Sequence, residues 1–466
     1  MTYEYYIIEV VMGMLFLGQR VVVIGAGISG IGAAEVLKKN GANVILNDIK
    51  SVDVGEEPYA NMAAQGIKLV FGDQSSRLLD GTDCVVASPG LSRDVPILQE
   101  ALKRKIPVIS EIEVAAQLCK APILAITGTN GKTTTTTLLG EMVKATGKQV
   151  VVGGNIGASL SELVCSLPAD GFAVAELSSY QLENTYTLKP KVAAILNLTP
   201  DHLQRHHTMG VYGKTKERIF MNQGPDDFTV LNYDDEYTRD MAKRSAGKVY
   251  FISSHYDLRQ GALCKGDDLI LRAAGKEFFV CHVSELLLFG RHNIENCLTA
   301  MMMAYLAGVD IQYIRKILMT FKGVEHRIEP VRMLHGVMYY NDSKGTNVDS
   351  SIKALEAFSG HIILIAGGFD KMNDITGFME LAAKKTDMLI LIGASAERFQ
   401  AAAEVAKVPC IQRASSLKEA VEMAHELSKP PQLVLLSPAC SSFDMFDNYE
   451  QRGAIFKRYV NELEDK

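Results

Sequence analysis

Short runs of apolar residues alternate with longer amphipathic segments along most of the chain. The first run, at residues 20–24, precedes a helix-like pattern at 28–40, and a second run follows at 43–46. Such alternation is typical of parallel sheets whose strands are joined by right-handed helical crossovers, so we predict an α/β fold. Further strands are expected at 85–87, 107–109, 123–126, 172–176, 192–196, 337–340, 362–366, 388–392 and 433–436.

Two stretches depart from this alternation. Residues 228–289 are rich in strand-like segments, and we expect a hairpin excursion there. Residues 1–18 are apolar and aromatic, with Glu4 and Glu9 and no basic residue. A signal peptide needs a basic start, and a membrane helix needs about 20 apolar residues without a central charge. We therefore expect an N-terminal extension, an extra strand or helix, and no membrane insertion.

Length and composition limit the class of protein. With 466 residues, the chain is too long for one ordinary core, so two to four domains are expected. It is 47% hydrophobic and 22% charged, as in soluble globular proteins, and its net charge of −6 argues against a nucleic-acid partner. Eight scattered cysteines without a C-x-x-C pair favour reduced, buried thiols in a cytoplasmic protein over disulfides or a zinc site.

Residues 123–134 carry the strongest chemical signal, an apolar strand followed by Gly-Thr-Asn-Gly-Lys-Thr-Thr. The backbone N–H groups of such a turn surround a phosphate, its lysine reaches the outer phosphates, and the next hydroxyl holds Mg²⁺. The match to the standard P-loop is partial, because Ile126 stands where that pattern has its first glycine. We favour a nucleotide site over a chance glycine turn. The turn consists of Gly128, Thr129, Asn130, Gly131, Lys132, Thr133 and Thr134.

A glycine fingerprint follows the first strand. Gly25, Gly27 and Gly30 form G-x-G-x-x-G, and Asp48 ends the next strand. Alone, this pattern with its ribose-binding acid indicates NAD or FAD. Because it places a pyrophosphate on a helix N-terminus, any nucleotide diphosphate fits, including a UDP-sugar. The alternative is glycines that only permit close helix–strand packing. The turn at Ser88 either approaches the same ligand or is a plain turn.

Two strand ends in the middle of the chain carry candidate metal ligands. Glu176 ends one apolar strand, and His202 follows another. Ligands of open α/β sheets bind outside the carboxyl ends of the strands, so both side chains are placed to face the glycine turn. A carboxylate suits Mg²⁺, whereas a single imidazole is a less usual ligand. A helix-capping or hydrogen-bonded histidine is the alternative.

The last third of the chain has three polar strand ends, at 340–347, 367–371 and 437–444. They contain Lys344, Lys371 and Ser442, a set of groups that suits a small dicarboxylate. Ordinary glycine and serine turns are the alternative. Arg327, shortly before them, can stack on a base or clamp a phosphate.

Seven segments spread over the chain resemble the Mur ligases of peptidoglycan synthesis. They are GTNGKTT, ELSSYQLE, LNLTPDHL, GRHNIENCLTA, GVEHRIE, NDSKGTN and SPACSSFDMFDNYEQRG. The resemblance covers nearly the whole chain from Arg20. The sixth and seventh segments resemble the members that add D-glutamate, and the DNPR-type motif of the diaminopimelate-adding members is absent.

The resemblance implies three α/β domains. They are a Rossmann-like UDP-binding domain at 1–110, with 1–18 as an extension, a central P-loop ATPase domain with a mainly parallel sheet at 111–323, and a Rossmann-like amino-acid-binding domain at 324–466. It also implies that ATP phosphorylates the terminal carboxylate of UDP-N-acetylmuramoyl-L-alanine and that the amine of D-glutamate attacks the acyl phosphate. A cytoplasmic monomer is expected.

The resemblance also implies roles for single residues. The expected catalytic residues are Lys132, Glu176, His202, Lys216 and Lys344. Mg²⁺ is expected on Thr133, Glu176, His202 and Lys216, the last as a carbamate formed with CO₂. The residues alone do not single out Lys216, because three basic residues on a helix usually form a solvated face. ATP is expected to contact the glycine turn, Asn293, Asn296, Arg327 and Asp342. The UDP-substrate is expected on Gly27, Ile28, Ser29, Asp48, Ile49, Lys50, Ser88, Asn155 and Ser178, and D-glutamate on Lys344, Thr346, Lys371, Ser442, Phe443 and Tyr449.

Some features depart from the family pattern. Gln204 stands where an acid is expected to orient His202, and Tyr449 replaces a more usual Phe. Other functions stay open: another Mur ligase or a folylpolyglutamate synthetase, an NAD-dependent oxidoreductase, and a nucleotide-binding regulator without turnover. The amino acid that stimulates phosphate release tests the first, and NADH fluorescence tests the second. The polar strand ends of the last third favour a second substrate over the third.

Overall fold

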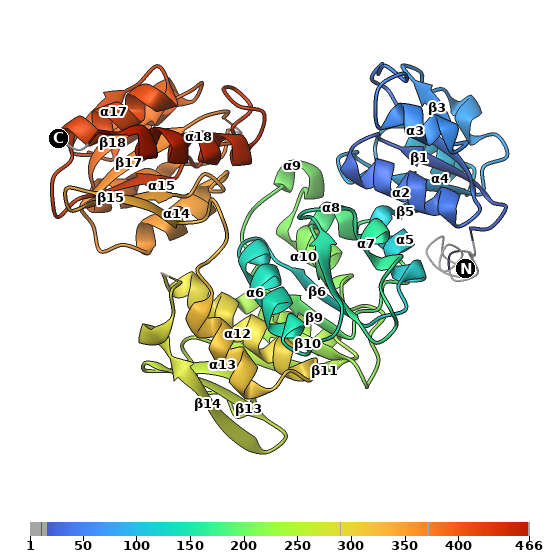
Figure 1. Cartoon of the computed structure of the whole chain (residues 1–466), viewed down its shortest axis with the longest axis horizontal. Helices are drawn as coiled ribbons and strands as arrows, with labels where there is room; N and C mark the ends of the chain where they lie inside the picture. Colours follow the sequence, from blue (N-terminus) through green and yellow to red (C-terminus); the bar gives the residue numbers. More distant parts are fainter. Residues whose placement is uncertain (1–10, 12–15, 289, 371, 465–466) are drawn as a thin grey trace. The chain divides into compact units, whose positions relative to one another are not determined.

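The computed structural model describes residues 11, 16–288, 290–370 and 372–464. Its strands form three sheets, each covered by helices (Figure 1). The chain divides into two compact units, residues up to 285 with 295–319, and residues 286–294 with those from 320 onward. The first unit contains two of the sheets and the second unit contains the third.

The first sheet has five parallel strands in the order β3-β2-β1-β4-β5. Its central strand is buried on both faces, which explains the unbroken apolar run in the sequence. The strand order reverses between β1 and β4, so the glycine fingerprint lies at a switch point. The strands are β1 (Arg20–Ile24), β2 (Asn43–Asp48), β3 (Lys68–Phe71), β4 (Cys84–Ala87) and β5 (Val108–Ser110), with helices α2 (Ile28–Lys39), α3 (Tyr59–Ala64), α4 (Pro96–Lys103) and α5 (Glu111–Leu118).

The central sheet has nine strands in the order β14-β13-β12-β11-β10-β9-β6-β8-β7. The expected hairpin excursion is partly wrong, because β10 and β11 pair in parallel and only β12 to β14 form antiparallel hairpins. The strands are β6 (Ile123–Thr127), β7 (Val150–Gly154), β8 (Phe172–Glu176), β9 (Val192–Ile195), β10 (Phe228–Asn232), β11 (Lys248–Ser253), β12 (Gly261–Lys265), β13 (Asp268–Ala273) and β14 (Lys276–His282). The helices are α6 (Lys132–Lys144), α7 (Leu160–Val164), α8 (Ser179–Leu182), α9 (Leu203–His206), α10 (Met209–Glu217), α11 (Glu236–Met241), α12 (Arg291–Leu306) and α13 (Ile311–Thr320).

The third sheet has the order β15-β16-β20-β17-β18-β19, with only β15 antiparallel to its neighbour. Apolar clusters fill both faces of this sheet. The strands are β15 (Glu329–Leu334), β16 (Val337–Asn341), β17 (Ile362–Gly367), β18 (Thr386–Ile392), β19 (Ile411–Arg413) and β20 (Leu433–Leu436). The helices are α14 (Val348–Glu356), α15 (Thr376–Lys385), α16 (Ala396–Val405), α17 (Leu417–Leu427) and α18 (Tyr449–Glu462).

Other expectations have mixed outcomes. All eight cysteines are free, but Cys165 is exposed and only four are buried, so the expectation of buried thiols is partly wrong. Within the described ranges, no helix is both long and apolar enough to cross a bilayer. The expected N-terminal strand or helix falls largely on 1–10 and 12–15, outside the described residues. The domain boundaries expected after residues 110 and 323 stay predictions.

Candidate active site

In each sheet, the polar strand ends that the sequence singles out belong to neighbouring strands. β1, with the glycine fingerprint, lies between β2 and β4. β6, with the glycine turn, lies between β8 and β9, the strands that lead to Glu176 and His202. β20 lies between β16 and β17, so the three polar ends of the third sheet are also adjacent. Because these neighbours are parallel, their carboxyl ends meet at one edge of each sheet.

The three fingerprint glycines have different structural roles. Gly25 has a φ of +100°, and a Cβ there would lie 2.5 Å from the Cβ of Ser88. A Cβ at Gly30 would lie 1.8 Å from the carbonyl oxygen of Gly25. A Cβ at Gly27 would meet nothing within 4 Å. The fold itself therefore requires glycine at 25 and 30, whereas the space beside Gly27 is open to a ligand.

Asp48 holds the fingerprint loop in place. Its carboxylate accepts hydrogen bonds from the backbone N–H groups of Ala26 and Lys50, both at 2.9 Å. Two apolar side chains next to these groups face solvent, with Ile28 73% and Ile49 66% exposed. Exposed apolar side chains beside an open glycine are suited to contact a ligand. Ser29 is half-buried and Lys50 is exposed nearby.

The glycine turn between β6 and α6 is built around two glycines with positive φ, Gly128 at +151° and Gly131 at +84°. Asn296, from α12, packs directly on this turn, since a Cβ at Gly131 would lie 2.2 Å from its Oδ1. The same oxygen accepts a hydrogen bond of 3.2 Å from the hydroxyl of Thr135. The fold thus brings one of the expected ATP-binding asparagines to the turn, 165 residues away in sequence.

Lys216 is fully buried, so the interpretation of its helix as a solvated basic face is wrong for this residue. It lies on α10, and its Nζ donates a hydrogen bond of 2.9 Å to the carbonyl oxygen of Gly128. Burial, and then the charge of Lys132, lower the pKa of Lys216 well below its usual value. Lys132 itself donates to the carbonyl oxygens of Gly128 and Thr129, at 2.9 and 2.7 Å.

The two carboxylate oxygens of Glu176 differ in their hydrogen bonding. One carboxylate oxygen accepts a 2.8 Å hydrogen bond from the amide of Asn155, while Oε2 is buried with no hydrogen-bond partner among the described residues. A buried carboxylate oxygen left unsatisfied is unfavourable, and a divalent cation satisfies it. Thr133, another expected Mg²⁺ ligand, is 7% exposed. These oxygens fit a hard cation, and Asn155 proves to contact the carboxylate of Glu176.

His202 is hydrogen-bonded, as the alternative interpretation expects, and part of its side chain also remains accessible to a ligand. It has a φ of +55° and stands at the N-cap of α9. Its Nδ1 lies 2.9 Å from the hydroxyl of Tyr180, yet its side chain stays 37% exposed. Gln204, where an orienting acid was expected, is exposed, and Tyr180 contacts the imidazole instead. Ser178 caps α8, since its hydroxyl accepts a hydrogen bond from the N–H of Gln181 at 3.2 Å.

In the second unit, Asp342 and Arg327 lie close together. Asp342 is 1% exposed and accepts hydrogen bonds from Ser437 Oγ at 2.7 Å and from the N–H of Ile328 at 3.3 Å. Burial raises the pKa of Asp342 to about 6, although the nearby Arg327 lowers it. The Nε of Arg327 is buried without a hydrogen-bond partner among the described residues, which leaves a donor for a ligand.

Four of the expected D-glutamate residues lie on two loops of this unit, after β16 and after β20, and Tyr449 begins α18. The Nζ of Lys344 lies 5.2 Å from the ring centre of Tyr449, and the N–H of Thr346 donates to the carbonyl oxygen of Lys344 at 2.8 Å. After β20, Ser442 is buried and Phe443 is 70% exposed. Lys371 lies outside the described residues. These roles stay predictions.

Arg452, which we did not single out from the sequence, ties these two loops together. It lies on α18 with no exposed surface. Its guanidinium donates to the carbonyl oxygens of Ser343 at 2.8 Å, Cys440 at 3.2 Å and Ser441 at 3.3 Å. The sequence does contain a signal for this role, because Arg452 occupies one of the buried positions of its helix, together with Phe456 and Val460.

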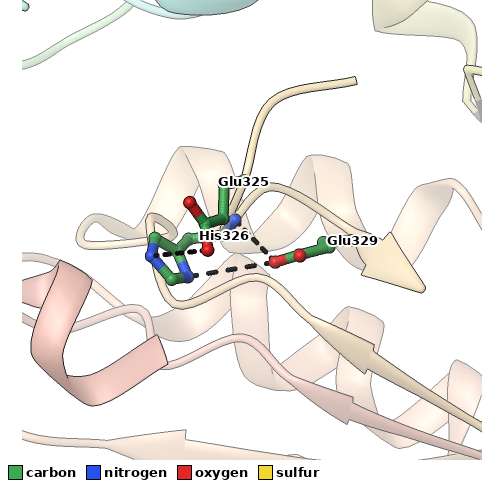
Figure 2. Close-up of side chains that lie close together, drawn as sticks. All are labelled: Glu325, His326 and Glu329. Carbon is green, nitrogen blue, oxygen red and sulfur yellow. Dashed lines mark hydrogen bonds and ion pairs between the residues drawn. The ribbon is translucent and has the colours of Figure 1, made fainter. Parts of the chain in front are cut away.

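Two carboxylates and an imidazole form a cluster ahead of β15. Figure 2 shows Glu325, His326 and Glu329, whose possible ligand atoms lie within 4.8 Å of one another. Lys457 pairs with both carboxylates, at 3.0 Å for Glu329. His326 Nδ1 also lies 2.9 Å from the amide nitrogen of Asn341. The cluster is therefore an ion-pair network beside the loop of Arg327, in which the Lys457 ammonium already neutralises both carboxylates.

Models of one protein family match the chain in three consecutive regions. Residues 19–110 match the Mur ligase MurD-like N-terminal domain, and residues 126–304 match the Mur ligase middle domain. Residues 326–440 match the Mur ligase glutamate ligase domain. The first and third regions contain the whole of their sheets, and the middle region contains the central sheet apart from residues 123–125 of β6.

Solved structures show the same three-domain α/β fold at low sequence identity. A pseudomurein peptide ligase type C from Methanothermus fervidus is 20% identical with a TM-score of 0.61, covering 96% of this chain and 100% of its own. A UDP-N-acetylmuramate-alanine ligase from Thermotoga maritima is 19% identical with a TM-score of 0.60 and the same coverage.

Curated relatives are far more similar. A protein of Thermoanaerobacter sp. (strain X514) is 45% identical over 96% of this chain and 99% of its own length. One of Lachnoclostridium phytofermentans is 43% identical over 97% of this chain and 100% of its own length. Both are named UDP-N-acetylmuramoylalanine–D-glutamate ligase. With relatives this similar along almost its full length, and its three regions matched in order, the chain belongs to the Mur ligase family.

Proposed function

We propose that the chain is an ATP-dependent ligase that adds D-glutamate to UDP-N-acetylmuramoyl-L-alanine in peptidoglycan precursor synthesis. The observation that carries this function is the shared name of relatives 42–45% identical over 95–97% of the chain. The MurD-like match at residues 19–110 agrees with it. The site adds support, because each sheet presents one set of polar strand ends, for three reactants.

The chemistry explains why ATP is needed. A carboxylate is a poor electrophile, and its phosphorylation supplies a leaving group. The substrate's terminal carboxylate attacks the γ-phosphorus of ATP, and ADP leaves. The amine of D-glutamate then attacks the acyl carbon, and phosphate leaves through a tetrahedral intermediate. Positioned cations offset the negative charge that crowds these steps.

The phosphate-binding part of the site is assigned to the first unit. The backbone of Gly128 to Thr134 surrounds the phosphates, Lys132 reaches the transferred group, and Asn296 supports the turn. Mg²⁺, when bound, supplies Lewis-acid stabilisation of the phosphate oxygens. Glu176 Oε2, Thr133 and His202 would hold it, and the unsatisfied oxygen of Glu176 supports that assignment.

Lys216 is proposed to act as a carbamate. A cation is an unfavourable neighbour for Mg²⁺, whereas a carbamate offers the hard oxygen ligand that Mg²⁺ prefers. Its formation needs a neutral amine, and the lowered pKa of the buried Lys216 supports one. The neutral amine attacks CO₂, a C–N bond forms, and the released proton leaves to solvent.

The other two sites follow the strand ends of their sheets. The UDP group is proposed to lie against Gly27, Ile28 and Asp48, within a domain of residues 1–110. D-glutamate is proposed to lie between the loops of Lys344 and Ser442, in a domain of residues 324–466, with ATP contacts from Asn293, Arg327 and Asp342. We expect a monomer that works in the cytoplasm, where ATP and the UDP-linked precursor are found.

One experiment tests the assignment. Phosphate release is measured with ATP, UDP-N-acetylmuramoyl-L-alanine and separate amino acids, including D-glutamate, L-glutamate and meso-diaminopimelate. Release is expected only with all three reactants present and D-glutamate as the amine. Equal release with L-glutamate, or without any amino acid, would contradict the proposed substrate.

A further inference from the structure

Arg205 connects the region of the first sheet to the region of the central sheet. The connection is made by its guanidinium, which is nearly buried. Its Nη1 donates to the carbonyl oxygen of Pro89 at 2.9 Å, and its Nη2 donates to that of Leu91 at 2.7 Å. The carboxylate of Glu183 accepts two further hydrogen bonds, at 2.9 and 2.6 Å. The Arg205 side chain is only 13% exposed. Four directed hydrogen bonds fix the plane of the guanidinium.

The turn that Arg205 holds is part of the fingerprint region. The N–H of Ser88 donates to the carbonyl oxygen of Ile24 at 2.9 Å, and the N–H of Leu91 donates to that of Ser88 at 3.0 Å. Ser88 also packs so closely against Gly25 that a Cβ there would clash with it. Residues 88–91 are therefore hydrogen-bonded to and packed against the loop to which the UDP group is assigned.

The same guanidinium covers Tyr180, which in turn holds His202. The Cζ of Arg205 lies 4.1 Å from the ring centre of Tyr180. The Tyr180 hydroxyl lies 2.9 Å from His202 Nδ1, with the two ring centres 4.8 Å apart. An imidazole that binds a metal through Nε2 must carry its proton on Nδ1 and donate it to an acceptor. The phenol oxygen of Tyr180, 2.9 Å from Nδ1, lies where such an acceptor is needed.

We propose that Tyr180 and Arg205 are positioning residues that couple the 88–91 turn to His202. Tyr180 fixes the tautomer and the orientation of the imidazole, and Arg205 fixes Tyr180 while it holds the turn. The helix of Lys216, α10, packs against both α8 and α9, which carry these residues (Figure 1). The inference rests on the proposed function, since it connects the UDP-substrate site to the assigned metal ligand.

The chain offers a matched control for this connection. Arg93 also links the first region to the segment after α8, donating to Asn184 Oδ1 at 2.8 Å and to the carbonyl oxygen of Glu183 at 2.7 Å. Among the described residues, its side chain contacts Asn184, the carbonyl oxygen of Glu183 and the hydroxyl of Tyr186, and it contacts neither Tyr180 nor His202. Arg93→Lys therefore perturbs a similar contact, to the backbone of Glu183, and removes no hydrogen bond of Arg205 or Tyr180.

The test measures Mn²⁺ binding by electron paramagnetic resonance, with a non-hydrolysable ATP analogue and the UDP-substrate present and no D-glutamate. The relevant ion is the one whose binding His202→Gln removes. Tyr180→Phe is expected to weaken the binding of that ion by about 10-fold and to leave the Kd of the UDP-substrate, measured by titration in the same mixture, within about twofold. Arg205→Lys is expected to weaken the binding of the ion and to raise that Kd, while Arg93→Lys leaves Mn²⁺ binding unchanged.

The double variant separates coupling from two independent defects. If Arg205 acts through Tyr180, Tyr180→Phe with Arg205→Lys should bind the ion no more weakly than Tyr180→Phe alone. Unchanged Mn²⁺ binding in a folded Tyr180→Phe protein, or additive losses in the double variant, would overturn the proposal. Because D-glutamate is absent, a wrong amino-acid assignment would leave these readouts intact.

A second measurement observes the imidazole of His202 in the wild-type protein. Nitrogen-15 NMR of histidine-labelled protein, with the His202 signals assigned from the His202→Gln spectrum, reports which ring nitrogen carries the proton. We expect the Nδ1-protonated tautomer with the Mg²⁺–nucleotide analogue bound. An Nε2-protonated ring would overturn the role of Tyr180, whatever the variants do.

Discussion

The side-chain nitrogens of Lys132 and Lys216 each lie 2.9 Å from the carbonyl oxygen of Gly128. One lysine begins α6 and the other lies near the end of α10, so the fold brings two cationic groups to a single acceptor. The repulsion between them adds to the burial that lowers the pKa of Lys216. A neutral Lys216 amine relieves this repulsion and is the form that reacts with CO₂.

Lys216→Ala should be nearly inactive, and acetate or formate should partly restore its activity. A short carboxylic acid fills the space of the missing side chain and presents an oxygen to the metal. Steady-state phosphate release with increasing acid measures the effect, and Lys214→Ala, an exposed neighbour on the same helix, is the control. Rescue by a small amine and by no acid would show that Lys216 acts as a cation.

Activity should depend on CO₂ and pH in a defined direction. Because the pKa of Lys216 is lowered, its neutral fraction is present at a lower pH than that of an ordinary lysine and is lost as the pH falls through the lowered pKa. Dialysis at mildly acidic pH in CO₂-free buffer should abolish activity. Return to pH 8 should restore activity only with bicarbonate. Carbon-13 NMR with labelled bicarbonate should show a carbamate signal that Lys216→Arg lacks, and full activity without CO₂ would exclude the carbamate.

Lys132→Ala should lower kcat by about 10³-fold, because a positioned cation on a transferred phosphoryl group contributes at that scale. The matched control is Lys144→Ala, which removes an exposed lysine from the end of the same helix, where it pairs with Glu141 on the surface. That control should keep its kcat. Near-normal turnover of Lys132→Ala would remove the glycine turn from the reaction.

Strand positions and strand-end chemistry were predictable because they depend on local patterns. The run at β1 is found at Arg20–Ile24 as expected, and Glu176 ends β8 as expected. In a parallel α/β sheet, an apolar run fixes both the strand and the edge at which its polar end lies. The order of β8, β6 and β9 in the sheet was not predicted, and it is the structure that makes these strands neighbours.

Contacts between distant helices were not predictable from those patterns. The burial of Lys216 depends on how its side chain on α10 reaches the end of β6, and its two basic neighbours, Lys214 and Arg218, hide this in the sequence. In the sequence, Tyr180 and Arg205 are ordinary polar positions. Only the folded structure brings the guanidinium of Arg205 onto the ring of Tyr180. The pairing of His202 with Tyr180 replaced the expected contact from position 204 for the same reason. Such contacts are set by tertiary packing, which no local period encodes.

Gly27→Val should raise the KM for the UDP-substrate and leave ATP binding and the melting temperature nearly unchanged. The fold has open space at this position, so the added side chain meets only the ligand. The contrasting variant is Gly30→Ala, whose Cβ would lie 1.8 Å from the carbonyl oxygen of Gly25 and should destabilise the fold. Kinetics and thermal denaturation of both variants check this. Selective loss of ATP affinity in Gly27→Val would mean that the two nucleotide sites are reversed.

Arg452→Met should destabilise the second unit and raise the KM for D-glutamate more than that for ATP. The variant leaves the buried carbonyl oxygens of Ser343 and Cys440 without their donor, at a loss of about 3 kcal/mol. Both loops assigned to D-glutamate then lose their shared anchor. The control is Arg458→Met on the same helix, because Arg458 is 60% exposed and pairs with Glu462 at 3.8 Å, an arrangement worth little.

The two effects of Arg452→Met can be separated by Arg452→Lys, which keeps the charge but replaces the planar fork with one ammonium. A lysine can satisfy one of the two loops but lacks the geometry to hold both. Thermal denaturation should therefore place Arg452→Lys between the wild type and Arg452→Met, while its KM for D-glutamate stays raised as in Arg452→Met. A KM that returns to the wild-type value together with stability would show that charge alone matters. The fork that joins the loops of Lys344 and Ser442 would then have no part in binding the amino acid.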